Sequence, residues 1–109
     1  MGDADAIGLR GKRLHIRYDG GIELLAEYGG SNELAWKALA GPAAGAQGRE
    51  VYEWYEAAPG VFFVAWLERT GTTVSQILDL QRGEVAAYVT FETPGGRQAV
   101  FMRGSVREA

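Results

Sequence analysis

Residues 61–68 read VFFVAWLE, and this run decides the fold because it is apolar at seven successive positions. If the run is a β-strand, its side chains alternate between two faces. One face then carries Phe62, Val64 and Trp66, and the other carries Val61, Phe63, Ala65 and Leu67. A strand of this kind needs an apolar cover on both sides. We therefore expect a strand in the centre of a packed β structure, with Glu68 on the same side as Trp66.

Shorter segments on both sides of this run alternate in the same way and are separated by turn residues. Residues 12–18 place Leu14, Ile16 and Tyr18 on one face, and residues 22–28 continue the pattern after the turn at Asp19-Gly20-Gly21. The expected strands span residues 12–18, 22–28, 33–39, 50–57, 61–68, 72–80, 84–92 and 98–103.

Two segments are less clear. Residues 33–39 contain good helix formers, so a short helix is an alternative there. Residues 40–48 are small and rich in glycine, which predicts the longest loop, with a possible role as a lid.

Eight strands joined by short turns favour a barrel over an open sheet. An open sheet leaves two edges with unpaired amides, and the sequence offers no helix to cover them. Closure removes both edges, and a barrel of eight strands holds side chains or one small ligand. We therefore predict an all-β fold, an antiparallel up-and-down barrel of the calycin or lipocalin type with an interior pocket.

Composition limits the class of protein. The 109 residues fit one domain over residues 1–109, and the formal net charge of -3 comes from scattered charges. A nucleic-acid partner is therefore not expected. The chain lacks cysteine, and the acidic start Met1-Gly2-Asp3-Ala4-Asp5 does not resemble a signal peptide. With no apolar run long enough to span a membrane, we expect a cytoplasmic protein.

The second apolar face of residues 61–67 needs a cover outside the barrel. Contiguous apolar surface on a protein usually marks a contact site. We expect a homodimer through this face, with a terminal segment folding over it as the alternative.

Several stretches carry a resemblance to a known family. They are residues 59–75, PGVFFVAWLERTGTTVS, with Leu78-Asp79 and residues 85–91, and the opening residues 11–23 with Tyr18-Asp19-Gly20-Gly21 at their turn. Together they cover about two thirds of the chain. They resemble the MoaF-like domains and their relatives, the bacterial phenolic acid decarboxylases. The resemblance implies a calycin-type barrel, often dimeric, with its pocket inside.

The decarboxylases use two tyrosines on the first strand, an arginine and a glutamate on the central strand, without a cofactor. The resemblance carries the glutamate to Glu68 and the second tyrosine to Tyr18. The first tyrosine position holds Ile16, and only Arg49 lies near the arginine region. A buried carboxylate needs a charged or polar partner. The incomplete set therefore argues against that reaction in this chain.

Glu68 and Tyr18 are nevertheless the candidate catalytic residues. At the end of an aromatic wall, desolvation would raise the pKa of Glu68 and suit it to proton transfer. The alternative is a solvated Glu68 paired with Arg69 or Arg17. Tyr18 would orient a substrate, or else place its hydroxyl at the rim. The residues expected to line the ligand site are Ile16, Leu24, Trp36, Phe62, Val64, Trp66 and Tyr88.

No metal or cofactor is expected. His15 is the only histidine, which rules out a multi-histidine metal site, and its neighbours Arg13 and Arg17 favour a solvated outer face. Three functions stay open. One is binding of a small, mostly apolar, aromatic metabolite, and another is a cofactor-independent lyase, isomerase or cyclase that uses Glu68. The last is a structural or regulatory subunit that acts through its outer apolar face.

Overall fold

Residues 8–109 are described by a computed structural model in which eight strands form a closed barrel. Each strand pairs antiparallel with the next, and β8 pairs with β1. The strands are β1 Lys12–Tyr18, β2 Glu23–Tyr28, β3 Glu33–Ala40, β4 Gln47–Ala58, β5 Val61–Leu67, β6 Thr73–Asp79, β7 Glu84–Thr93 and β8 Gly96–Glu108. This confirms the predicted all-β, up-and-down barrel, which fits the calycin-like description. The acidic start of the chain, Met1 to Asp5, lies outside the described residues.

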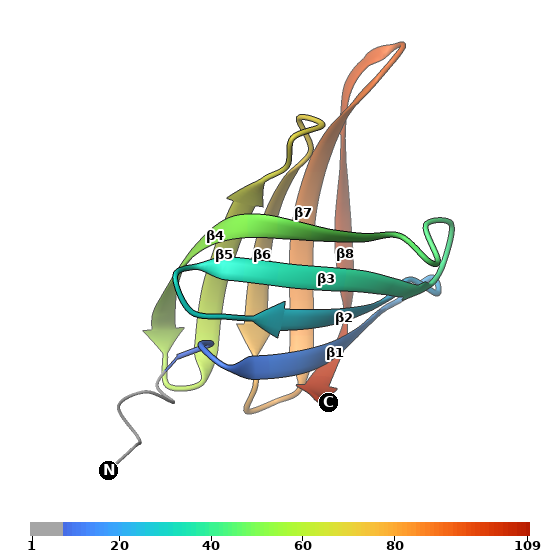
Figure 1. Cartoon of the computed structure of the whole chain (residues 1–109). Coiled ribbons are helices and arrows are strands. Elements are labelled where there is room, and N and C mark those ends of the chain that lie inside the picture. The colour runs from blue at the N-terminus through green and yellow to red at the C-terminus, as the bar shows by residue number, and fades with distance from the viewer. Residues whose placement is uncertain (1–7) are drawn as a thin grey trace.

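The barrel is flattened into two layers. In Figure 1, β1 to β3 run across the front and β5 to β8 run behind them in a crossing direction. β4 joins the layers, because Gln47 to Val51 pair with β3 whereas Tyr52 to Ala58 pair with β5. The interior lies between the layers. Residues 8–109 hold no helix that is long and apolar enough to cross a membrane.

Alternation along the strands decides which side chains face inward. Leu14, Ile16 and Tyr18 of β1 are buried, as predicted. In β6 the inward residues are Val74, Gln76 and Leu78, and in β7 they are Val85, Ala87 and Val89. The prediction that Tyr88 lines the ligand site is therefore wrong. Tyr88 lies one position out of phase with the inward residues of β7, and 51% of it is exposed.

The structure resolves the two segments that the sequence left less clear. Residues 33–40 form a strand, so the helical alternative fails. The predicted loop over residues 40–48 is shorter, because Gln47 and Gly48 already belong to β4. Gly48 lies opposite Trp36, and a Cβ on it would approach the indole to 2.9 Å. Its lack of a side chain, which suggested a loop, makes room for the indole.

One half of the interior is solidly packed. Leu9, just before β1, is fully buried and joins an apolar cluster with Leu14, Tyr52, Phe62, Val64, Leu78 and Val85. Leu9 thus closes this end of the barrel, where the β2–β3, β4–β5 and β6–β7 turns also lie. The other half, towards the β5–β6 turn, contains the cavity described next.

Candidate functional site

A cavity of about 170 Å³ occupies the open half of the barrel. Its walls come from seven of the eight strands or the residues that follow them. They are mostly apolar, and besides two indoles and two phenols they include one amide and one carboxyl group. The lining residues are Ile16, Tyr18, Leu24, Ala26, Tyr28, Leu34, Trp36, Trp66, Glu68, Val74, Gln76, Val89 and Met102. An apolar hollow with a few convergent polar groups is the usual form of a small-molecule site.

A chain of hydrogen bonds crosses this cavity. The Tyr28 hydroxyl donates to Gln76 Oε1 at 2.9 Å, and Gln76 Nε2 donates to the Tyr18 hydroxyl at 3.2 Å. Only 2% of Gln76 is exposed, so these bonds satisfy a side chain that would be costly to bury alone. Burial raises the pKa of both phenols above the ordinary value of a tyrosine. Both hydroxyls therefore stay protonated at neutral pH.

Two indole–carboxylate pairs lie at one end of the cavity, which we call its mouth: Trp36, Trp66 and Glu68 line the cavity, and Glu50 adjoins it through its bond to Trp36. Trp66 Nε1 donates to Glu68 Oε2 at 3.0 Å, and Trp36 Nε1 donates to Glu50 Oε2 at 3.0 Å. The mouth opens here because β4 has not yet begun to pair with β5 at Glu50, while β5 has ended before Glu68. The two pairs therefore line an interrupted part of the sheet.

Glu68 is half-buried, and its surroundings disfavour its charged form. Desolvation by burial is the main cause that raises the pKa of its carboxyl group, and the negative charge of Glu50 raises it further. The hydrogen bond from Trp66 acts in the opposite direction and lowers this pKa. Glu68 is thus shifted in the direction expected of a group that exchanges protons near neutral pH.

The structure brings six of the nine predicted site residues together around one cavity. They are Ile16, Tyr18, Leu24, Trp36, Trp66 and Glu68. Phe62 and Val64 also point inward but belong to the packed half, where Phe62 meets the edge of Trp54. Tyr88 points outward. Neither Arg69 nor Arg17 forms the salt bridge considered for Glu68, and Arg17 lies 3.6 Å from Glu23 instead.

Sequence reasoning missed Glu50, Gln76 and Tyr28. The register of β6 with β5 places Gln76 inward, because Gln76 lies opposite inward-facing Val64. Glu50 was placed at the start of a strand without a role. Its position two residues before inward-facing Tyr52 on an alternating strand would have signalled that it faces inward as well.

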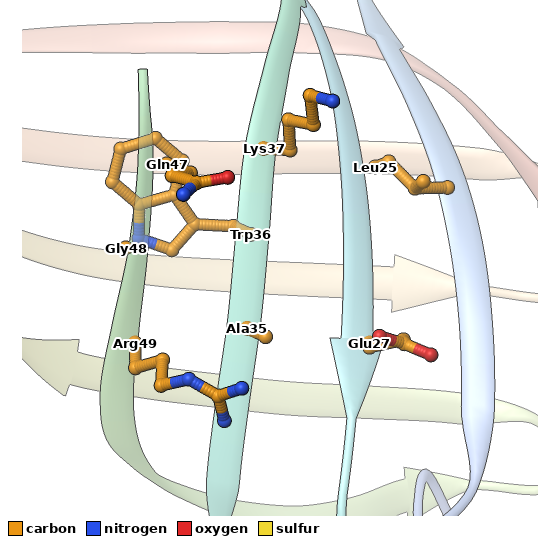
Figure 2. Close-up of a pocket in the computed structure, with 8 residues that line it drawn as sticks. All are labelled: Leu25, Glu27, Ala35, Trp36, Lys37, Gln47, Gly48 and Arg49. Atoms are coloured by element: carbon orange, nitrogen blue, oxygen red, sulfur yellow. The ribbon is translucent and has the colours of Figure 1, made fainter. Parts of the chain in front are cut away.

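A second hollow, of about 450 Å³, lies on the outer face of β2, β3 and β4. Figure 2 shows its lining, with the Trp36 indole lying across β4 at Gly48 and the side chains of Lys37 and Arg49 nearby. Although larger, this hollow is lined mostly by residues on the outer face of the strands, such as Glu27, Lys37 and Arg49. We therefore take the interior cavity as the candidate site, and Trp36 contributes to both.

The two remaining basic side chains, His15 and Arg49, do not line the cavity. His15 lies on the outer face, with Nε2 at 3.0 Å from Glu23 Oε1, as its neighbours predicted. Arg49 lies on the outer face of β4, in the second hollow. The arginine that the decarboxylase pattern requires therefore has no counterpart in the lining of the cavity.

Comparisons with known proteins agree with this architecture. A family model described as MoaF-like matches residues 10–107. A crystal structure from Burkholderia vietnamiensis, provisionally described as a beta-lactamase, is 28% identical in sequence and superposes with a TM-score of 0.83. The match covers 93% of this chain and 95% of that one. No curated protein matches the chain.

Proposed function

The chain belongs to the MoaF-like family, and from this premise we propose that its barrel binds a small, mostly apolar, aromatic metabolite. The observation that carries the proposal is the cavity of about 170 Å³ between the layers. A barrel that served only as a scaffold would gain stability by filling this space, because unfilled volume in a core is destabilising. Trp36 and Trp66 at the mouth supply surfaces on which a planar ring can pack.

The absence of cysteine supports a cytoplasmic location for this activity. The proposed partner is a small molecule rather than a nucleic acid, because the chain has a net charge of -3 and its basic residues are scattered.

A second candidate function is cofactor-independent proton transfer, as in a lyase, isomerase or cyclase. It is favoured by the raised pKa of Glu68, whose carboxyl group shares the cavity with the Tyr18 hydroxyl. In this reaction class Glu68 would take a proton from the bound molecule and return it, while Tyr18 would hold the substrate by a hydrogen bond.

The beta-lactamase description of the Burkholderia vietnamiensis protein is not a function that we extend to this chain. Serine beta-lactamases require a serine nucleophile with a lysine three residues later. The sequence contains no Ser-x-x-Lys motif, and the cavity lining contains neither residue type. Within residues 8–109 no group of three His, Cys, Asp or Glu side chains could hold a metal ion.

Native mass spectrometry of freshly purified protein tests the binding proposal. We expect a retained small molecule that is lost in Leu24→Trp, because Leu24 lines the cavity and the larger indole would fill it. The matched control is Leu39→Trp, the same change on the exposed outer face of β3. Equal retention by both variants, with circular dichroism showing both folded, would place the molecule outside the barrel and overturn the proposal.

Glu68→Gln separates the two candidate functions once the retained molecule is identified. Retained binding with lost conversion of that molecule supports catalysis. Retained binding with no conversion by either protein leaves the barrel as a binding module.

A further inference from the structure

We infer that the molecule bound in this cavity carries a protonated amine on a body of about one aromatic ring, and that Glu50 and Glu68 hold the cation at the mouth. The inference rests on the proposed function and narrows it to one class of ligand. It assigns a binding role to Glu50, a residue outside the predicted site.

The strand register places the two carboxylates opposite one another. Tyr52 of β4 lies opposite Trp66 of β5. Two residues further out on each segment, Glu50 and Glu68 occupy the next inward-facing positions, just beyond the last pair of the ladder. Both are half-buried, and each accepts a hydrogen bond from one indole. Their electrostatic coupling is strong enough that Glu50 disfavours the charge on Glu68.

This negative end of the cavity has no compensating positive group in the described part of the chain. The lining includes no lysine, arginine or histidine, and the salt bridges of residues 8–109 involve other carboxylates. A ligand with a carboxylate would be repelled here, whereas an organic cation would supply the missing partner.

Two carboxylates alone would not define a site, but a buried hydroxyl in the same cavity points to a ligand independently. Only 5% of Tyr18 is exposed. Its hydroxyl oxygen accepts a hydrogen bond from Gln76 Nε2, while its own O–H donates to no acceptor among residues 8–109. If the oxygen and nitrogen of the Gln76 amide exchanged places, Tyr18 would donate to the amide oxygen and the Tyr28 hydroxyl would lack an acceptor instead. One amide group can accept a hydrogen bond from only one of the two phenols in this arrangement. A ligand with a hydrogen-bond acceptor on its ring satisfies this donor.

The size of the cavity limits the body of the ligand. A protein cavity of about 150 Å³ accommodates benzene. The 170 Å³ between Tyr28 and Trp66 is therefore room for one ring, with the amine extending to the mouth.

Calorimetric titration with three probes of similar shape and different charge tests the inference. The probes are 2-phenylethylamine, 2-phenylethanol and 3-phenylpropionate. We expect the amine to bind about tenfold or more tighter than the alcohol, as one charge-assisted pair provides, and the carboxylate to bind most weakly. Raising the ionic strength should weaken amine binding and leave alcohol binding unchanged.

Variants assign the preference to the two carboxylates. Glu50→Gln and Glu68→Gln each keep an oxygen that accepts the indole hydrogen bond, and each should lower amine affinity several-fold without changing alcohol affinity. The double variant should lose the preference for the amine. Glu53→Gln is the matched control, because Glu53 is exposed on the same strand as Glu50 and should leave all three affinities unchanged.

Tyramine extends the test to the buried hydroxyl. Its phenol places an acceptor at the inner end of the ring, so it should bind more tightly than 2-phenylethylamine to the unmodified protein. Tyr18→Phe should remove that advantage while keeping the preference for a cation.

Equal affinities for the amine and the alcohol, or tightest binding of the carboxylate, would overturn the inference and leave the barrel as a binder of aromatic molecules. Binding of none of the three probes would also overturn it. In that case the retained molecule seen by native mass spectrometry still decides the proposed function separately.

Discussion

Glu68 links the chemistry of the cavity mouth to the stability of the fold. Burial and the neighbouring Glu50 raise the pKa of Glu68 above 4.5, its ordinary value. The folded protein therefore binds a proton at this site more tightly than the unfolded chain does. By linkage, the stability contributed by the protonated group is fully present below about pH 4.5 and is lost as the pH rises through the raised pKa.

Glu68→Gln should therefore stabilise the protein at neutral pH. Glutamine is neutral at every pH and still accepts the Trp66 hydrogen bond, so the melting temperature at pH 7 should rise by a few degrees. Near pH 4 the difference from the unmodified protein should shrink towards zero. Thermal melts followed by circular dichroism between pH 4 and 8 check this, with Glu53→Gln as the control for removing an exposed charge. A variant that is less stable than the unmodified protein at pH 7 would contradict it.

At the scale of single residues, the sequence predicted the centre of the site better than its edges. Alternation through residues 61–68 placed Trp66 and Glu68 on the same face as Phe62 and Val64, and that face is the inward one, although residues 61–67 are apolar on both faces. Tyr88 failed because its strand offers apolar side chains in both phases, Val89 on one face and Tyr88 on the other. Glu50 was missed because only its spacing from Tyr52, and the point where β4 leaves β3, place it opposite Glu68.

At the scale of elements, the contact between β1 and β8 closes the barrel and depends on one glycine. Gly104 lies opposite Tyr18, and a Cβ on it would overlap the backbone carbonyl of Arg17. Backbone atoms cannot move aside as a flexible side chain would. The strand pair must therefore separate if any side chain is introduced at this position.

Gly104→Ala should therefore destabilise the protein by about 3 kcal/mol or more, at the upper end of the cost of overpacking. Urea denaturation measures the change in the free energy of unfolding. Gly95→Ala is the matched control, because a Cβ there meets only Thr93 Oγ1 at 3.8 Å. A loss below about 1 kcal/mol for Gly104→Ala would show that the two strands separate at little cost.

The extent of β8 shows why this element was harder to predict than β1. The sequence indicated residues 98–103, whereas the strand spans Gly96–Glu108. Its last turn-like residues, Gly104 and Ser105, lack the apolar alternation that marks a strand. They are held in the sheet by pairing with β1, a contact between the two ends of the chain that no local pattern reveals.

At the scale of the whole molecule, large apolar side chains gather on the outside of the back layer. Tyr55 lies opposite Phe63, which lies opposite Ile77, and Tyr88 lies opposite Phe101. Four of these five are exposed, Phe63 being partly covered. We define them as the outer apolar surface. The predicted homodimer remains a proposal, and this surface, centred on the outer face of β5 and β6, is where a second copy of the chain would bind.

Light scattering after size-exclusion chromatography checks the dimer. We expect twice the chain mass of 11.8 kDa at micromolar concentration, and a monomer for Phe101→Glu, which places a charge within the apolar contact. Leu39→Glu, on the exposed outer face of β3, should leave the mass unchanged. A monomeric unmodified protein would remove the dimer and leave the outer apolar surface without a partner.

Leu9 and the apolar cluster around it fill one end of the barrel, which leaves the other end for the exchange of a bound molecule. Whatever occupies the cavity must leave by the route through which it entered, past Trp36 and Trp66. An incoming molecule cannot push out a resident one from behind. The rate of ligand exchange should therefore equal the dissociation rate of the bound molecule, independent of the concentration of the competitor. If the bound molecule is converted inside the barrel, the product must dissociate before the next substrate binds.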